Sequence, residues 1–142
     1  MRVERVTAAS DEILAALDRL LPQLSPGRTG PSREELAEIA SAPGTILLVA
    51  RDGENIVGTL TLLLYRIPTG TRGWIHDVVV DESARGRGVG EALTQEALAI
   101  ATAAGTETVN LTTRRHRAAA HRLYTRLGFV ERESDVFVWR PE

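Results

Sequence analysis

The chain has 142 residues, a length that fits one folded domain around a single core. Seventeen Lys and Arg residues oppose nineteen Asp and Glu residues, and this net charge of −2 excludes a general electrostatic attraction to nucleic acid or to anionic membranes. Cysteine is absent, which excludes disulfides and thiol catalysis, and no apolar run reaches the length of a membrane span. We therefore expect a cytoplasmic protein with one domain over residues 1–142, which binds neither nucleic acid nor membrane.

The first half of the chain predicts two helices and three strands. Residues 2–6 alternate polar and apolar side chains, as a strand does, and Ser10 can cap a helix whose apolar stripe ends at Pro22. Ser32 and Glu35 have the spacing of a capping box, which predicts the start of a second helix. Strand-like runs at 45–50 and 56–65 flank a turn sequence, so this part of the sheet is expected to be antiparallel.

The second half predicts further strands alternating with helices. Residues 74–80 are apolar except for His76 and Asp77, as in a strand that is buried on both faces. A helix over 88–104, a strand over 109–112, a helix over 118–127 and two short strands within 129–139 follow. The order β-α-α-β-β-β-α-β-α-β-β predicts a mixed α/β domain with a central, mostly antiparallel sheet flanked by helices.

A glycine-rich turn, residues 85–90, stands between the buried strand and the longest predicted helix. Helix N-termini present free backbone N–H groups, and glycines let a phosphate approach them, so this position favours phosphate binding. The alternative is that the glycines only permit a tight turn. A P-loop is excluded because the chain has no Gly-Lys-Ser or Gly-Lys-Thr. The dinucleotide pattern fails as well, since Glu91 or Leu93 would stand at its third glycine.

Two segments carry a resemblance to a known family. The spacing R-x-x-G-x-G in residues 85–90, after the strand Val78-Val79-Val80, resembles the coenzyme A pyrophosphate motif of the GNAT acyltransferases. The segment from Ala120 to Phe129, with its Leu-Tyr pair and closing Leu-Gly-Phe, resembles the C-terminal signature of that superfamily. The resemblance covers residues 2–139. It implies a GNAT-like domain that transfers an acetyl group from acetyl-CoA to a primary amine by direct attack on the thioester, and it suggests a homodimer.

The resemblance also implies roles for individual residues. The backbone of the strand would bind the pantetheine arm, and Tyr124 would donate a proton to the departing thiolate, although a plain core position is its alternative role. Arg117 stands where many GNAT sequences have Asn, so it is a candidate contact to the cofactor phosphates, or else part of a solvated basic loop over 114–117. The implied cofactor-binding residues are Val78, Val79, Val80, Arg85, Gly86, Arg87, Gly88, Val89, Gly90, Arg117 and Tyr124.

The catalytic base is not given by the resemblance. Deprotonating an amine with a pKa near 10.4 at pH 7 costs about 4–5 kcal/mol, so a base is expected. Many GNAT branches have Glu where this chain has Trp74. His76 and Asp77 are the nearest titratable candidates, and a period of two predicts that they point to opposite faces. We favour Asp77, because some small-amine acetyltransferases of the superfamily carry acidic residues there; a buried structural role for either residue is the alternative.

Other chemistries fit the sequence poorly. Three histidines without cysteine give no recognisable metal site, and Ser83 lacks the G-x-S-x-G context of a serine hydrolase. The competing function is a non-catalytic sensor that binds acyl-CoA, which Trp74 at the usual base position favours. The expected acceptor is a small-molecule or peptide amine.

Overall fold

The computed structural model describes all residues from 1 to 142 and divides them into two compact units, 1–112 and 113–142. The first unit contains the whole sheet, three α-helices and a 3₁₀ turn. The second contains one helix followed by a segment without regular secondary structure. None of the helices combines the length and the apolar character that crossing a bilayer requires.

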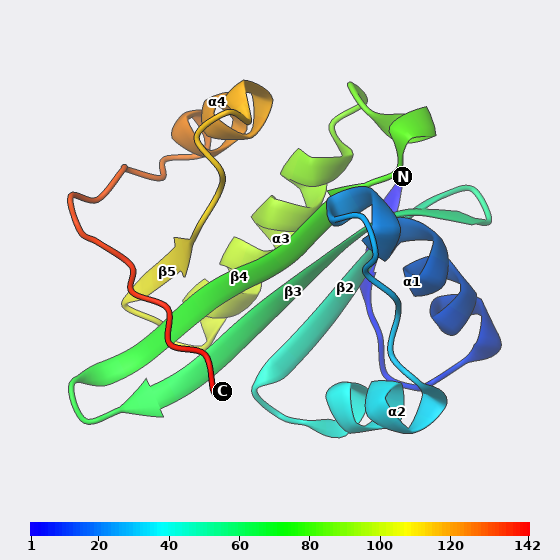
Figure 1. Ribbon diagram of the computed structural model, residues 1–142, viewed down its shortest axis with the longest axis horizontal. Helices are drawn as coiled ribbons and strands as arrows, with labels where there is room; N and C mark the ends of the chain where they lie inside the picture. The colour runs from blue at the N-terminus through cyan, green and yellow to red at the C-terminus, as the bar shows by residue number, and fades with distance from the viewer. The chain divides into compact units, whose positions relative to one another are not determined.

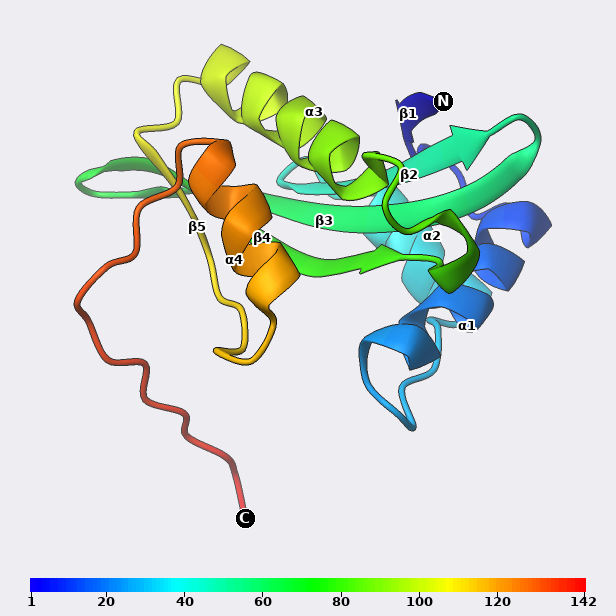
Figure 2. The same cartoon turned by 90° about the horizontal axis from the view of Figure 1, so that it is seen from above.

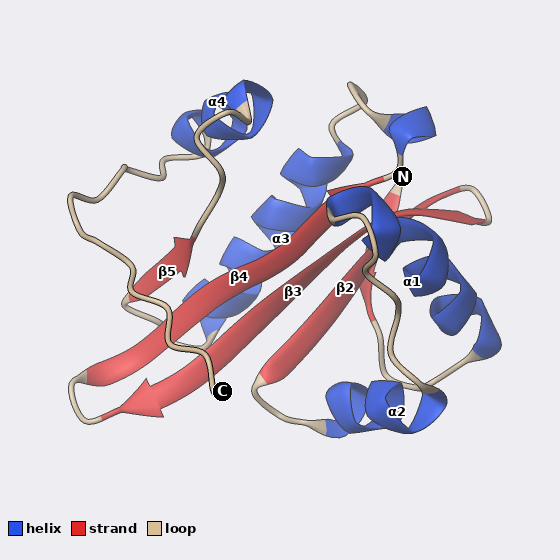
Figure 3. Cartoon of the chain, viewed as in Figure 1, coloured by secondary structure: helices blue, strands red, loops and turns tan.

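The sheet of the first unit has five strands in the spatial order β1-β2-β3-β4-β5 (Figures 1 and 3). Neighbouring strands from β1 to β4 are antiparallel, and β5 is parallel to β4. The mixed, mostly antiparallel sheet predicted from the sequence is therefore confirmed. The strands are β1 (Arg2–Arg5), β2 (Thr45–Asp52), β3 (Asn55–Ile67), β4 (Gly70–Val80) and β5 (Thr108–Leu111).

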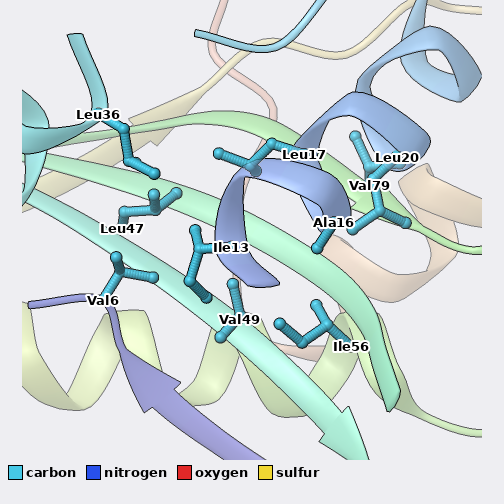
Figure 4. Close-up of a cluster of buried hydrophobic side chains, with 10 residues drawn as sticks. All are labelled: Val6, Ile13, Ala16, Leu17, Leu20, Leu36, Leu47, Val49, Ile56 and Val79. Carbon is cyan, nitrogen blue, oxygen red and sulfur yellow. The ribbon is translucent and has the colours of Figure 1, made fainter. Parts of the chain in front are cut away.

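Helices cover both faces of this sheet. Helix α3 (Val89–Ala103) lies on one face, while α1 (Asp11–Leu24) and α2 (Arg33–Ser41) lie on the other (Figure 2). Gly58 of β3 allows α3 to come close, because a Cβ there would lie 2.8 Å from Val89 Cγ1. The core on the α1 and α2 side is drawn in Figure 4 and consists of Val6, Ile13, Ala16, Leu17, Leu20, Leu36, Leu47, Val49, Ile56 and Val79.

Local sequence signals set the starts of α1 and α2. Ser10 Oγ accepts a hydrogen bond from the Ile13 N–H. At α2 both halves of the predicted capping box are present, since Ser32 Oγ accepts from the Glu35 N–H and the Glu35 carboxylate accepts from the Ser32 N–H. These two helix starts are confirmed.

The predicted end of α1 at Pro22 is wrong, because the helix continues to Leu24. A proline fits helical φ, so only one N–H bond is lost where the ring interrupts the last turn. Leu24 packs against the core on the α1 and α2 side, and the Ser25 N–H donates to the Leu21 carbonyl oxygen at 3.4 Å. Packing of the final turn thus outweighs the missing bond.

The second unit contains α4 (Ala118–Arg126), followed by Gly128 in the left-handed region at φ +97°. The predicted helix over 118–127 is confirmed to within one residue. The two short strands predicted within 129–139 are wrong, because these residues form no strand. Their alternating pattern expresses a preference for a half-buried pleated surface, and a strand forms only where a partner strand accepts its backbone bonds.

Candidate functional site

The glycine-rich turn joins a short 3₁₀ turn, η1 (Glu82–Ala84), to the start of α3. Gly86 and Gly88 have φ of +79° and +78°, a left-handed conformation that side-chain-bearing residues rarely adopt. A Cβ added to either glycine would have no atom within 4 Å, so the space beside the turn is open. Gly88 caps α3 without a side-chain bond, and the first N–H groups of the helix have no intrahelical partner. The turn therefore combines helix-start N–H groups that lack intrahelical partners with open space beside its glycines.

The two arginines of the turn are held differently. Arg87 donates through Nη1 to Asp52 Oδ2 at 3.0 Å and through Nη2 to the Ser83 carbonyl oxygen at 2.9 Å. Its guanidinium thus ties the turn to the end of β2 and to η1. Arg85 donates only through Nε, to the Val80 carbonyl oxygen at 3.4 Å. Of the two side chains, Arg85 is the one whose terminal nitrogens remain for an incoming anion.

The segment before the turn is anchored to α1. Asp81 accepts hydrogen bonds from Arg19 Nη1 at 2.6 Å and from the Ser83 N–H at 3.1 Å. These bonds lower the pKa of Asp81 below its ordinary value, and the bond from the Ser83 backbone contributes most. The Glu82 N–H donates to Gln23 Oε1 at 3.0 Å. Sequence reasoning missed this anchor, although Asp two residues before Ser is a recognisable turn signal.

A polar cavity of about 260 Å³ lies between α1, the β2–β3 hairpin and the turn. Its charged groups neutralise one another, because Arg19 pairs with Asp81 and Arg87 pairs with Asp52. The paired charges therefore hold the turn in place, and we do not interpret the cavity as a separate site for a charged ligand. It is lined by Arg19, Asp52, Asn55, Ile56, Val57, Asp81, Ser83 and Arg87.

Strand β4 carries a bulge at the candidate base residues. Thr59 pairs with Val79 and Thr61 pairs with His76, so β4 holds one residue more than β3 in this interval. Asp77 lies in the bulge with φ +52°, an uncommon value that Asp tolerates better than most side chains. The bulge breaks the period of two from which the opposite orientations of His76 and Asp77 were predicted.

The prediction that β4 is buried on both faces is wrong at His76 and Asp77. Both His76 and Asp77 are exposed, so the strand is not buried on both faces here. Neither residue is the buried structural polar group that was the alternative interpretation. Both remain available to a substrate.

Beyond the bulge, β4 has no β5 partner along its outer edge. The parallel pairing joins Arg72–Ile75 to Thr108–Leu111 and ends there, because β5 has only four residues. The segment Val78–Val80 follows, with Val79 buried in the core and its two neighbours half-buried. An edge of this kind can bond an extended ligand chain through its backbone.

Tyr124 lies on α4 in the second unit and is partly buried. Burial raises the pKa of its phenol, and the nearby Arg117 charge lowers it by less. Its ring meets the ring of Phe129 edge to face, with centroids 5.5 Å apart. The phenol thus stays protonated at neutral pH, which suits a hydrogen-bond or proton donor and not a base.

The start of α4 is cationic, as the sequence predicts. Arg117 is its N-cap residue without a side-chain cap, and the first turn has no acidic residue. A ring nitrogen of His121 lies 3.2 Å from the Arg114 carbonyl oxygen, which links the basic segment to the helix. No group of three or more potential metal-ligating side chains occurs in the chain.

Known proteins share both the sequence pattern and the fold. The model of the acetyltransferase (GNAT) family matches residues 13–129. A mycothiol acetyltransferase of Beutenbergia cavernae is 36% identical over 88 residues, which are 62% of this chain but 29% of that protein. The chain therefore spans less than a third of this curated relative.

Solved structures extend the similarity over nearly the whole chain. An acetyltransferase of Trypanosoma brucei is 28% identical, with coverage of 98% of this chain and 99% of that chain and a TM-score of 0.79. An aminoglycoside acetyltransferase from an uncultured soil metagenomic sample, in complex with trehalose, is 22% identical at coverages of 99% and 95%, with a TM-score of 0.85. At 22% identity, the similarity to the aminoglycoside acetyltransferase concerns the fold alone.

Proposed function

Because the chain belongs to the acetyltransferase (GNAT) family, we propose that it transfers an acetyl group from acetyl-CoA to a primary amine. The observation that carries the proposal is the turn at the start of α3, with two left-handed glycines and open space beside them. This turn lies inside the family match, which runs through both compact units, so we treat residues 1–142 as one catalytic domain.

In this proposal the turn holds the pyrophosphate of the acyl donor. The N–H groups from Gly86 to Gly90 would bond the phosphate oxygens, and Arg85 would add a charge-assisted donor. Arg87 would act as a positioning residue, since it is already bonded to Asp52 and Ser83. The unpaired edge at Val78–Val80 would hold the pantetheine arm through backbone bonds.

The acetyl group leaves the thioester when the amine nitrogen attacks the carbonyl carbon, so that a C–N bond forms and the C–S bond breaks. Tyr124 would stabilise the departing thiolate. Moving a proton from a phenol of pKa near 10 to a thiolate of pKa near 8.5 is uphill by about 2 kcal/mol, and the raised pKa of Tyr124 increases this cost. We therefore assign Tyr124 mainly a hydrogen-bond donor role toward the developing charge.

The attacking amine must also lose a proton. Asp77 is our proposed base, acting directly or through water, because its carboxylate is exposed at the bulge where β4 and β5 part. His76 is the second candidate on the same segment. Asp77→Asn keeps a residue that tolerates positive φ while removing the base, so a loss of turnover in this variant reports on chemistry and not on the backbone.

The activity can be tested by the release of free coenzyme A from acetyl-CoA in the presence of a panel of amines. Because the chain has no cysteine, a thiol reagent reports the released thiol without background from the protein. Acetyl-CoA that binds but is not consumed with any amine would favour the non-catalytic sensor, whereas an absence of binding would refute both functions.

A further inference from the structure

A stacked aromatic pair occupies the face of β4 opposite α3. Gly58, Leu60 and Leu62 of β3 alternate onto the α3 face, and Leu62 pairs with Ile75, so Ile75 also faces α3. Trp74 and His76, on either side of Ile75 in the sequence, therefore lie on the opposite face. Their ring centroids are 6.1 Å apart, with the planes inclined by 25°. Trp74 is half-buried and His76 is exposed.

The cross-strand neighbours of this pair are neutral side chains. The register places Leu63 of β3 and Asn110 of β5 on either side of Trp74, and Thr61 of β3 beside His76. All three neighbours are partly exposed. We call this surface the Trp74 platform; it consists of Thr61, Leu63, Trp74, His76 and Asn110.

The charged residues of β4 stand at the two ends of the platform and leave its β4 residues uncharged in between. Arg72, two residues before Trp74, pairs with Glu107 at 3.0 Å. Asp77 lies at the other end, in the bulge. An aromatic surface with an amide, a hydroxyl and an imidazole around it thus lies next along β4 to Asp77, the carboxylate proposed to take the proton from the acceptor.

The platform also adjoins the place where the acyl group would arrive. Asn110 and Trp74 lie one register position before the last β4–β5 pair, Ile75 with Leu111. Beyond that pair the β4 edge loses its β5 partner, and the proposed pantetheine strand begins three residues after Ile75, at Val78. An acceptor on the platform would therefore present its amine near the end of the pantetheine arm.

We propose that the Trp74 platform binds the acceptor and that this acceptor is a primary amine carried on a hydroxylated saturated ring, as in an amino sugar; the inference rests on the proposed function. The flat C–H face of such a ring packs on an indole, while its hydroxyls exchange bonds with amide, hydroxyl and imidazole groups. A flexible open-chain amine would lose more conformational entropy on the same surface. It would also offer no flat face for Trp74 to cover.

The test compares glucosamine with its reduced open-chain form, 2-amino-2-deoxyglucitol, which has the same carbon skeleton and the amine on the same carbon. Acetyl-CoA binding is first verified by calorimetry, and kcat/KM is then measured for both acceptors per free amine. We expect the native enzyme to favour the ring by about tenfold or more. Trp74→Ala should abolish this preference through the acceptor KM, leaving the KM of acetyl-CoA unchanged. The control Tyr65→Ala, which removes an exposed aromatic side chain further along β3, should keep the preference.

Several results would overturn the inference while leaving the proposed function intact. These are equal use of the two acceptors by the native enzyme, a ring preference that survives in Trp74→Ala, and turnover of another class of amine but of neither sugar. If Trp74→Ala does not fold, Trp74→Phe and Asn110→Ala take its place, and each should reduce the preference. A failure of acetyl-CoA to bind, seen before any amine is added, would instead refute the proposed function.

Discussion

Replacing Gly88 tests the acyl-donor site most directly. Gly88 has φ +78°, where a residue with a Cβ costs about 1–2 kcal/mol. An added Cβ meets nothing within 4 Å, so no clash adds to this cost. In Gly88→Asp the carboxylate stands at a helix N-terminus, where the macrodipole returns about 0.3–1 kcal/mol. We therefore expect a net loss of about 1 kcal/mol in the free energy of unfolding and a Tm lowered by about 3–5 °C.

The effect on acetyl-CoA should be far larger than the effect on stability. A carboxylate about 5 Å from a phosphate charge is repelled by about 3 kcal/mol at an effective dielectric constant near 20. That energy corresponds to about a 100-fold increase in Kd. Gly88→Asn has nearly the same shape without the charge, so the difference between the two variants isolates the electrostatic part.

The assay is calorimetric titration with acetyl-CoA beside thermal unfolding of the free protein. The matched control is Gly105→Asp, because Gly105 lies just beyond the other end of α3 with φ +74° and also has nothing within 4 Å of an added Cβ. It should destabilise the fold somewhat more than Gly88→Asp, because the macrodipole disfavours a carboxylate at a helix C-terminus, and it should leave acetyl-CoA binding unchanged. The placement of the pyrophosphate on this turn would be refuted by a Kd for Gly88→Asp within threefold of the native value. It would also be refuted if Gly105→Asp lost as much affinity for acetyl-CoA as Gly88→Asp.

Three further variants test the roles assigned to single residues. Tyr124→Phe should lower kcat by about 10–100-fold with little change in the KM of acetyl-CoA. Because burial raises the pKa of the phenol, Tyr124 should stay protonated as pH rises toward 10, and the steady-state rate of the native enzyme should show no loss of this donor over that range. Asp52→Asn releases Arg87 from an exposed ion pair worth about 1 kcal/mol or less, so calorimetry should show acetyl-CoA affinity weakened by up to about fivefold. Asp81→Asn should lower the Tm at pH 7. Because the folded-state pKa of Asp81 is depressed, the stabilisation is fully present above about pH 4 and is lost as pH falls through the folded-state pKa, so the Tm gap to the native protein should narrow below pH 4.

Each of these three has an outcome that contradicts its reasoning. An unchanged kcat in Tyr124→Phe would show that the Tyr124 hydroxyl takes no part in catalysis and that the side chain serves only in packing. Tighter binding in Asp52→Asn would mean that the ion pair withholds Arg87 from the donor phosphates instead of positioning the turn. A Tm gap for Asp81→Asn that is the same at pH 7 and pH 3 would show that the carboxylate charge contributes nothing to the anchor.

Where the sequence predictions succeeded, the signals were local. The capping box of Ser32 and Glu35 involves residues three apart, and the predicted helix after the glycine-rich turn begins directly after Gly88. The predictions that failed depended on partners far away in the chain. Residues 129–139 have a strand-like pattern but form no strand, and α1 runs past Pro22 because Leu24 packs on the core.

The bulge in β4 shows the same limit at the candidate site. A period of two is a property of a regular strand, and nothing in the sequence from His76 to Val79 marks the extra residue that the pairing with β3 reveals. The ties from Arg87 to Asp52 and from Arg19 to Asp81 join residues 35 and 62 positions apart, and only the fold brings them together.

The sequence by itself determined the order of helices and strands up to α4, the glycine-rich start of α3 and the resemblance to the GNAT acyltransferases, because each depends on neighbouring residues whose spacing is fixed by helix and strand geometry. The tertiary structure alone decided which arginine of the turn has its terminal nitrogens bonded to the protein, where β4 loses its β5 partner, and that Trp74, His76 and Asn110 share one face. Those facts depend on register and on contacts between distant segments, which are set by the packing of the whole sheet and have no local signal.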